Sequence, residues 1–207
     1  MFEFVIRQTC LSLIFTYICN MRRSEMKQHI VETASMLFYQ KGYNSTGINE
    51  IIAKSNIAKA TLYSHFKSKE DICVAYLKFK NSTFLHDIEA YCLLRSEGEM
   101  QLLALFDFLQ EFFIDRDFNG CWCIKTVAEI PKENEKIRTE IQQQKQSFLQ
   151  LIEKLLQANF SAISATKSKH LARQIYLLYE SGVTESHLHQ EDWPIKEARE
   201  LCARILK

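Results

Sequence analysis

The chain has 207 residues, of which 47% are hydrophobic and 25% charged, with only five glycines and two prolines. This composition is typical of a folded globular protein, and so few turn-forming residues argue against many short strands and favour long helices. The net charge of +1 hides an asymmetry: residues 21–80 carry ten Lys/Arg against five Asp/Glu, whereas residues 81–207 carry 15 against 19. This asymmetry suggests a polyanionic partner for the N-terminal part alone.

The first twenty residues form an apolar extension that ends before a basic pair, Arg22-Arg23. Its run TCLSLIFTYICN is too short to span a bilayer, and a secretion signal carries its charge before the apolar run. Three interpretations stay open. Translation starts naturally at Met21, or the segment is an extra helix on the body, or it has a membrane or targeting role.

The seven cysteines are scattered and odd in number. Without a convincing secretion signal, we expect reduced thiols and a cytoplasmic location. Cys121 and Cys123 are two apart on a predicted helix and should point to different faces, and His187 and His189 have the same spacing. We therefore expect no metal site and no cofactor.

In the N-terminal part, helical periodicity predicts a first helix from Arg22 to Lys41, ended by Gly42. Thr46 is expected to cap a short second helix, and Asn56 to make the turn that follows. A third helix is predicted from Lys59 to His65.

The remainder of the chain also has helical periodicity. Ser68 is expected to open a helix that reaches the low nineties, and Asp192 to cap the last one, with Pro194 in its first turn. Between them, helices are predicted at about 100–114, 121–130, 132–160 and 167–190. No segment alternates convincingly as a strand, so the predicted fold class is all-α. We divide it into the extension 1–20, a basic three-helix domain 21–67 and a larger helical domain 68–207.

Three short helices in a basic segment have the layout of a helix-turn-helix. Leu62 and Phe66 share one face of the third helix and, with Ile57 at the turn, would hold it in place. Donor side chains lie off this face, where they can meet phosphates and base edges. The candidate DNA contacts are Lys59, Thr61, Tyr63 and His65, with Lys69 in the next helix and Thr46 as a cap whose hydroxyl also meets phosphate. Tyr63 and His65 could instead be spacers, and Lys69 a solvated cap residue.

Residues 30–72, IVETASMLFYQKGYNSTGINEIIAKSNIAKATLYSHFKSKEDI, resemble the DNA-binding domain of the TetR/AcrR family of bacterial transcriptional regulators. The matching positions are Leu37-Phe38, Gly42-Tyr43, Thr46, Ile52-Ala53, Thr61 to Tyr63 and Phe66 to Asp71. The resemblance implies an all-helical homodimer that binds a palindromic operator in double-stranded DNA. It also implies a larger C-terminal domain whose small-molecule effector releases the protein from DNA.

The sequence departs from the family pattern at the turn. The family usually has Gly, an aliphatic residue and Ser, where this chain has Asn56-Ile57-Ala58. Asn tolerates the left-handed conformation, but Ala in place of a Ser cap costs about 1 kcal/mol. We therefore expect a slightly frayed start to the recognition helix.

The stretch FNGCWCIKTVAEIP contains a second candidate site. Gly120-Cys121 is similar to a Gly-Cys pair that opens a central helix in many members of the family. A cysteine at a helix N-terminus has a lowered pKa and can react with oxidants or electrophiles. Cys121 is therefore a candidate thiol sensor, or simply a small packing residue. No base is evident near it in sequence, so an enzyme with Cys121 as nucleophile is the weaker alternative.

Aromatic side chains on the later helices are candidates for an effector pocket, although most would be core residues. They are Phe106, Phe112, Phe113, Trp122 and Phe148. They favour an apolar or aromatic effector, and no basic cluster indicates a strongly anionic one. Residues 167–207 resemble the family's dimerisation surface, where a close approach across a two-fold axis would explain Gly182 inside a helix.

The predicted function is that of a sequence-specific transcriptional regulator, a repressor released from its operator by a small molecule, and not an enzyme. The alternative within the same class is a repressor that senses oxidants or electrophiles through Cys121. A non-specific or membrane-tethered DNA-binding protein that uses residues 1–20 stays open as a third possibility, although no membrane partner is expected.

Overall fold

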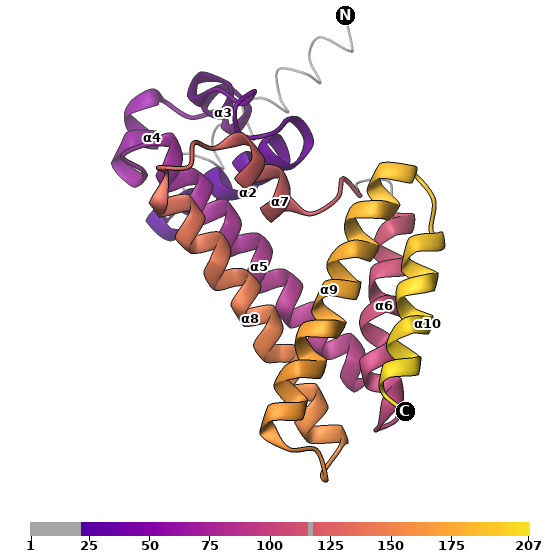
Figure 1. Ribbon diagram of the computed structural model, residues 1–207. Helices are drawn as coiled ribbons and strands as arrows, with labels where there is room; N and C mark the ends of the chain where they lie inside the picture. Colours follow the sequence, from indigo (N-terminus) through magenta and orange to yellow (C-terminus); the bar gives the residue numbers. More distant parts are fainter. Residues whose placement is uncertain (1–21, 116–117) are drawn as a thin grey trace, which may run out of the picture. The chain divides into compact units, whose positions relative to one another are not determined.

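The computed structural model describes residues 22–115 and 118–207. Every regular element in these residues is an α-helix, which confirms the predicted fold class (Figure 1). The extension 1–20 lies outside the described residues. The described residues divide into two compact units, one that ends at Tyr76 and one that begins at Leu77. This division falls inside α5 (Lys69–Leu93), whereas the predicted boundary lies just before that helix.

The N-terminal unit contains α2 (Arg23–Lys41), α3 (Ile48–Ser55), α4 (Lys59–His65) and the first two turns of α5. Helices α3 and α4 have only eight and seven residues, so they stay in place by burying an apolar face rather than by their own helix propensity. The core of the unit consists of Ile30, Ala34, Leu37, Phe38, Ile51, Leu62, Phe66, Ile72 and Tyr76. A hydrogen bond of 3.0 Å between His29 Nε2 and the Ser55 carbonyl joins α2 to the end of α3.

The C-terminal unit contains the rest of α5 and five further helices. They are α6 (Glu99–Ile114), α7 (Trp122–Glu129), α8 (Glu135–Asn159), α9 (Ala165–His189) and α10 (Trp193–Ile205). Helix α9 is the central element, because it packs on α8, on α6 and most extensively on α10 (Figure 1). The predicted cap Asp192 does precede α10, with Pro194 in the first turn.

Gly182 shows that α9 and α10 approach closely within one chain. A Cβ added at Gly182 would lie 3.3 Å from Leu109 of α6, and 3.7 Å and 3.8 Å from Ile195 and Ala198 of α10. The glycine is therefore explained by packing inside the unit. The expectation that an approach across a two-fold axis explains it is wrong.

Candidate nucleic-acid interface and effector cavity

The turn before α4 has the geometry that its residues predict. Asn56 adopts the left-handed conformation, with φ 52° and ψ 43°. Ala58 is the N-cap of α4 and makes no side-chain hydrogen bond, and the helix runs from Lys59 to His65 as predicted. The missing cap is thus confirmed at a position whose extended backbone (φ −74°, ψ 149°) would suit a serine.

Helix α4 has one buried face and one exposed face. Leu62 is fully buried and Phe66 is 4% exposed, so these two side chains hold the helix on the unit. Lys59 is exposed and Tyr63 is 43% exposed. Thr61 and His65 are half-buried beside them. The structure therefore brings four of the six predicted DNA-contacting residues together on one short helix.

Thr46 is not the cap that the sequence suggests. The N-cap of α3 is Gly47, and the Thr46 hydroxyl instead donates 2.8 Å to the Gly42 carbonyl. The Thr46 side chain is fully buried. Because the hydroxyl is buried and already bonded to the turn after α2, it stabilises the fold. Thr46 is therefore not one of the exposed candidate DNA contacts.

Lys69 lies in the first turn of α5, as predicted, and its position is restrained. The Ser68 hydroxyl caps this helix by accepting 3.1 Å from the Asp71 amide. The Lys69 ammonium lies 4.4 Å from the centre of the Tyr43 ring, within cation–π distance. Tyr43, which is not among the predicted DNA contacts, therefore helps to position this lysine.

A further basic group lies beside the end of α4. Arg23, Ser24 and Lys27 of α2 border a surface hollow with Ser64 and His65. Burial, followed by the charges of Arg23 and Lys27, lowers the pKa of His65, so the imidazole is neutral at pH 7. The sequence analysis did not single out Arg23 and Lys27, because about 40 residues separate them from α4. Their charge contributed only to the excess of Lys and Arg in residues 21–80.

The C-terminal unit contains a cavity between α5, α6, α7, α8 and α9, with a volume of about 40 Å³. Of the five aromatic residues predicted for a pocket, Phe112, Trp122 and Phe148 line it. Phe106 is fully buried against Tyr179, and Phe113 packs on Phe118, so these two do not reach the cavity. Their helical spacing could not show which side of α6 faces the space.

Two aromatic residues that the sequence did not single out complete the cavity wall. The ring of Phe84 in α5 lies edge-on to the rings of Trp122 and Phe148, with distances of 5.4 Å and 5.2 Å between ring centres. The ring centre of Tyr179 in α9 lies 4.8 Å from that of Phe148. On the other side of Phe84 is an outer hollow of about 310 Å³, which shares Phe84, Phe112 and Trp122 with the cavity. These three rings therefore separate a small inner space from a larger outer one.

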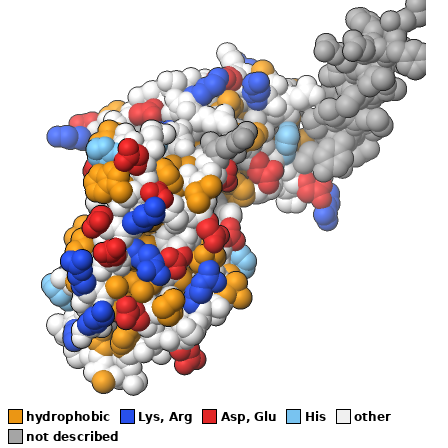
Figure 2. Space-filling model, turned by 90° about the vertical axis from the view of Figure 1, so that its right-hand side faces the viewer, with side chains coloured by type: hydrophobic (Ala, Val, Ile, Leu, Met, Phe, Trp, Pro, Cys, Tyr) orange, Lys and Arg blue, Asp and Glu red, His pale blue; other side chains and the backbone are white. Residues whose placement is uncertain are grey.

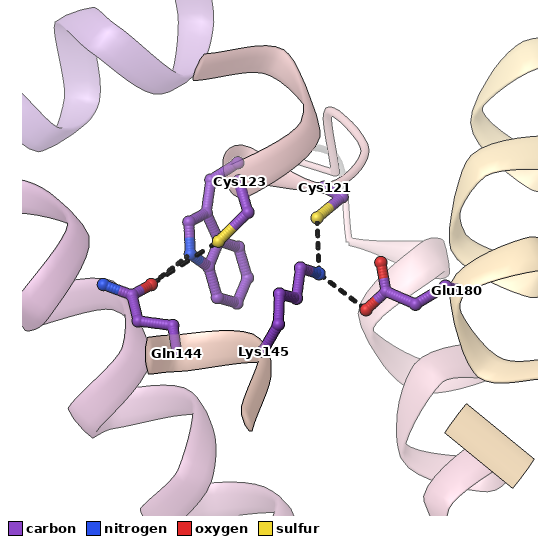
Figure 3. Close-up of polar contacts among 6 residues, drawn as sticks. Cys121, Cys123, Gln144, Lys145 and Glu180 are labelled. Atoms are coloured by element: carbon purple, nitrogen blue, oxygen red, sulfur yellow. Dashed lines mark hydrogen bonds and ion pairs between the residues drawn. The ribbon is translucent and has the colours of Figure 1, made fainter. Parts of the chain in front are cut away.

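The polar end of the cavity contains a lysine between a carboxylate and a thiol (Figure 3). The Lys145 ammonium of α8 donates 2.6 Å to Glu180 of α9 and 3.2 Å to Cys121 Sγ. Both side chains of the ion pair are about four-fifths buried. Although burial opposes its charge, the Cys121 sulfur and Glu180 raise the pKa of Lys145, so it stays protonated.

Cys121 is the N-cap of α7, so the prediction that it opens this helix is confirmed. The neighbouring Cys123 and the charge of Lys145 lower the pKa of Cys121 to about 6, against the opposing effect of burial. Both cysteines line the same cavity, Cys121 beside Lys145 and Cys123 beside Gln144, so the expectation that they point to different faces is wrong. That expectation assumed helical backbone at both residues, whereas Cys121 is extended (φ −78°, ψ 115°).

The surface of α9 and α10 carries large exposed apolar side chains. They are Leu177, Leu188, Trp193 and Leu201. The face drawn in Figure 2 shows, in its lower half, apolar side chains among charges of both signs on the C-terminal unit.

The described part of the chain contains neither a metal-binding cluster nor a helix that could span a membrane. No group of three or more His, Cys, Asp or Glu side chains there is arranged to hold a metal ion. Of the helices that the structure describes, none is both long and apolar enough to cross a membrane.

Comparison with known proteins matches both units of the chain. Residues 30–76 match the family model described as bacterial regulatory proteins, tetR family, and residues 98–202 match the tetracyclin repressor-like C-terminal domain. Among solved structures, a TetR-family transcriptional regulator from Streptomyces coelicolor has a TM-score of 0.78 at 23% identity and covers 88% of this chain and 95% of its own. A TetR-family regulator from Cytophaga hutchinsonii has the same TM-score at 16% identity, over 90% and 96% of the two chains.

Similar proteins of known role are negative transcriptional regulators of the biofilm operon icaADBC, called IcaR. The one from Staphylococcus aureus is 29% identical over 175 residues, which cover 84% of this chain and 91% of that protein. The one from Staphylococcus epidermidis is 32% identical over 116 residues, which cover 56% and 59%. The second family model alone spans just over half of the sequence. The chain belongs to the TetR family of bacterial regulatory proteins and is a DNA-binding transcriptional regulator.

Proposed function

We propose that this protein is a homodimeric repressor that binds a palindromic operator through α4 and leaves it when a small molecule occupies the cavity of the C-terminal unit. The observation that carries the proposal is the exposed donor face of α4. Tyr63 and Lys59 are exposed on a helix that Leu62 and Phe66 anchor from behind. A helix that enters the major groove needs this combination of a fixed apolar face and an open polar one.

The surrounding positive charge supports a phosphate contact on either side of the base-reading residues. Lys69 lies against the Tyr43 ring on one side, and Arg23 and Lys27 border the hollow with His65 on the other. Phosphate contacts of this type set the position of a protein on the duplex, while base contacts specify the sequence. In this arrangement Lys59, Thr61, Tyr63 and His65 face the bases or the nearest phosphates.

The exposed apolar residues of α9 and α10 support dimerisation through residues 167–207. A dimer with two-fold symmetry presents two copies of α4 and therefore recognises a site with matching symmetry. The negative regulators of similar sequence support repression rather than activation. An effector that binds better to the DNA-free form shifts the population towards it and releases the operator.

The cavity supports a neutral and apolar effector. Lys145 is the cation at its polar end, and Glu180 already compensates this charge. At about 40 Å³ the inner space holds only a few atoms, whereas typical ligand sites measure roughly 300–1,000 Å³. A larger effector would therefore have to displace the Phe84 ring, so that the inner cavity and the outer hollow become one space.

The test is binding of the purified full-length protein to palindromes from the DNA upstream of its own gene, measured by fluorescence anisotropy. We expect tight, salt-dependent binding to one palindrome and weak binding to a shuffled duplex. Lys59→Ala should weaken binding and lower the salt slope by about 0.9, the share of one phosphate contact. Lys132→Ala removes the same charge from an exposed site in the C-terminal unit and should change neither. Equal affinity for the palindrome and the shuffled duplex would refute the proposal.

A further inference from the structure

We propose that Cys121 and Cys123 form a redox site, in which a hydroperoxide oxidises the two thiols to a disulfide and so lowers the affinity of the protein for its operator. Only the effect on DNA rests on the proposed function. The thiol chemistry rests on the cavity alone.

The first observation is that both sulfurs are buried yet lie on a cavity. Cys121 is 8% exposed and Cys123 is 2% exposed, and both line the inner space. A volume of about 40 Å³ exceeds the roughly 10–15 Å³ that one water molecule requires. The space therefore admits hydrogen peroxide or the head of a short organic hydroperoxide.

The second observation is that the two thiols have different hydrogen-bond partners. Cys121 Sγ accepts a hydrogen bond of 3.2 Å from Lys145 Nζ, which favours its thiolate. The Cys123 thiol donates 3.5 Å to Gln144 Oε1, and the neighbouring Cys121 together with burial raises its pKa. One thiolate beside one protonated thiol is the arrangement that a peroxide-reactive cysteine and its resolving partner need.

The other buried cysteines of the unit lack these partners. Burial raises the pKa of Cys92 and of Cys202 to about 12. Both side chains are fully buried, and neither lines the cavity. The proposed site is therefore distinguished from the remaining described thiols of this unit by charge and by access.

The reaction has two balanced steps. The Cys121 thiolate attacks the terminal oxygen of the hydroperoxide, so that an S–O bond forms and the O–O bond breaks. The alkoxide or hydroxide that leaves takes a proton from Lys145. The Cys123 sulfur then attacks Cys121 Sγ, an S–S bond forms, and the hydroxyl leaves as water with the Cys123 proton. Two thiols lose two electrons in total, and the hydroperoxide becomes an alcohol and water.

The second step is coupled to the first through charge. The thiolate of Cys121 is the main reason that the pKa of Cys123 is raised. Conversion of that thiolate to a neutral sulfenic acid removes the effect and makes Cys123 a better nucleophile at the moment when its target forms. Disulfide formation also removes the sulfur charge from Lys145, which leaves the lysine with Glu180 and changes the packing between α7, α8 and α9.

The experiment treats reduced, full-length protein with tert-butyl hydroperoxide and maps its tryptic peptides. Both cysteines lie in one peptide, DFNGCWCIK, between Arg116 and Lys125. We expect this peptide to lose two hydrogen masses and to regain them with dithiothreitol. Cys123→Ser should stop at a sulfenic acid that dimedone traps, Cys121→Ser should leave the peptide unoxidised, and Cys202→Ser should behave like the wild type.

The same samples are titrated with operator DNA. Oxidation should weaken binding by about tenfold or more, within the usual range of coupling between sites, and dithiothreitol should restore it. A peptide that keeps both thiols while cysteines elsewhere oxidise would overturn the redox site. A disulfide that leaves operator affinity unchanged would overturn its regulatory role. Reduced protein that binds no operator would instead count against the proposed function, with the peptide result still valid.

Discussion

The Lys145 ammonium lies 2.6 Å from the Glu180 carboxylate, and this ion pair between α8 and α9 sets the electrostatics of the cavity. Lys145 stabilises negative charge on Cys121, whereas Glu180 opposes it. The two members of the pair therefore act on the same sulfur with opposite sign.

This opposition predicts contrary effects of two substitutions on the reactivity of Cys121. Lys145→Met should raise the pKa of Cys121 above its value of about 6 and slow its alkylation by iodoacetamide at pH 7. Glu180→Gln should lower the pKa further and extend alkylation to more acidic solutions. The measurement is the rate of Cys121 alkylation between pH 5 and 9, read by peptide mass, with Cys202 as the internal reference that reacts only in strong alkali. Shifts of the same sign in both variants would contradict the assignment.

Restoring a serine at Ala58 should stabilise α4. The residue already has the extended backbone of an N-cap, and its side chain makes no cap bond. Ala58→Ser should add about 1 kcal/mol to the free energy of unfolding, which corresponds to a rise in Tm of roughly 2–4 °C for a chain of this size. Ala60→Ser, at an exposed position inside α4, is the control and should not stabilise. An unchanged Tm together with unchanged operator affinity would show that the cap is unimportant here.

Enlarging Gly182 should destabilise the C-terminal unit. A side chain there meets Leu109 and the backbone of α10 at Ile195, so Gly182→Leu must push the helices apart at a cost of about 1–3 kcal/mol. Thr184→Leu makes a change to the same residue type at an exposed position of α9. Thermal unfolding should show a clear fall in Tm for the first variant and little change for the second. If both variants unfold at the wild-type temperature, the described packing of α9 on α10 is not tight.

Charges placed on the apolar surface of α9 should separate the proposed dimer. Leu177 and Leu188 are 64% and 69% exposed, and Leu177→Asp with Leu188→Asp would bring carboxylates into a contact that excludes water. Sedimentation should then give a monomer at concentrations where the wild type is a dimer, with a parallel loss of operator binding. Leu94→Asp is the control, since Leu94 is 78% exposed at the end of α5. A wild-type chain that sediments as a monomer would remove the basis for this prediction.

Tyr43 should matter for DNA binding through Lys69. Its ring lies 4.4 Å from the lysine ammonium, and an exposed cation–π contact contributes about 0.5–1 kcal/mol. Tyr43→Leu should therefore weaken operator binding several-fold, while Tyr43→Phe, which keeps an aromatic ring, should retain most of the affinity. Anisotropy titrations of the two variants at one salt concentration compare them directly. Equal losses would show that the hydroxyl rather than the ring is responsible.

The helices and the exposed donor face of α4 were determined by the sequence, because they depend on local patterns. Asn56 makes the left-handed turn, Ala58 leaves α4 uncapped, and Leu62 and Phe66 anchor it, all as their types and spacing predict. These features need only neighbours a few residues apart, for which helical periodicity gives the relative positions.

Only the tertiary structure decided what the distant residues do. Thr46 bonds to Gly42 instead of capping α3, and Gly182 packs on α10 of its own chain. Lys145 and Glu180 reach Cys121 from positions 24 and 59 residues further along the chain, and no sequence pattern links them. The Thr46 bond lies in the loop between α2 and α3. By contrast, the contacts of Gly182 and of Lys145 with Glu180 and Cys121 exist because helices far apart in sequence bury apolar faces together. The contacts that this packing creates depend on the rotation of every helix about its axis, which periodicity fixes only approximately.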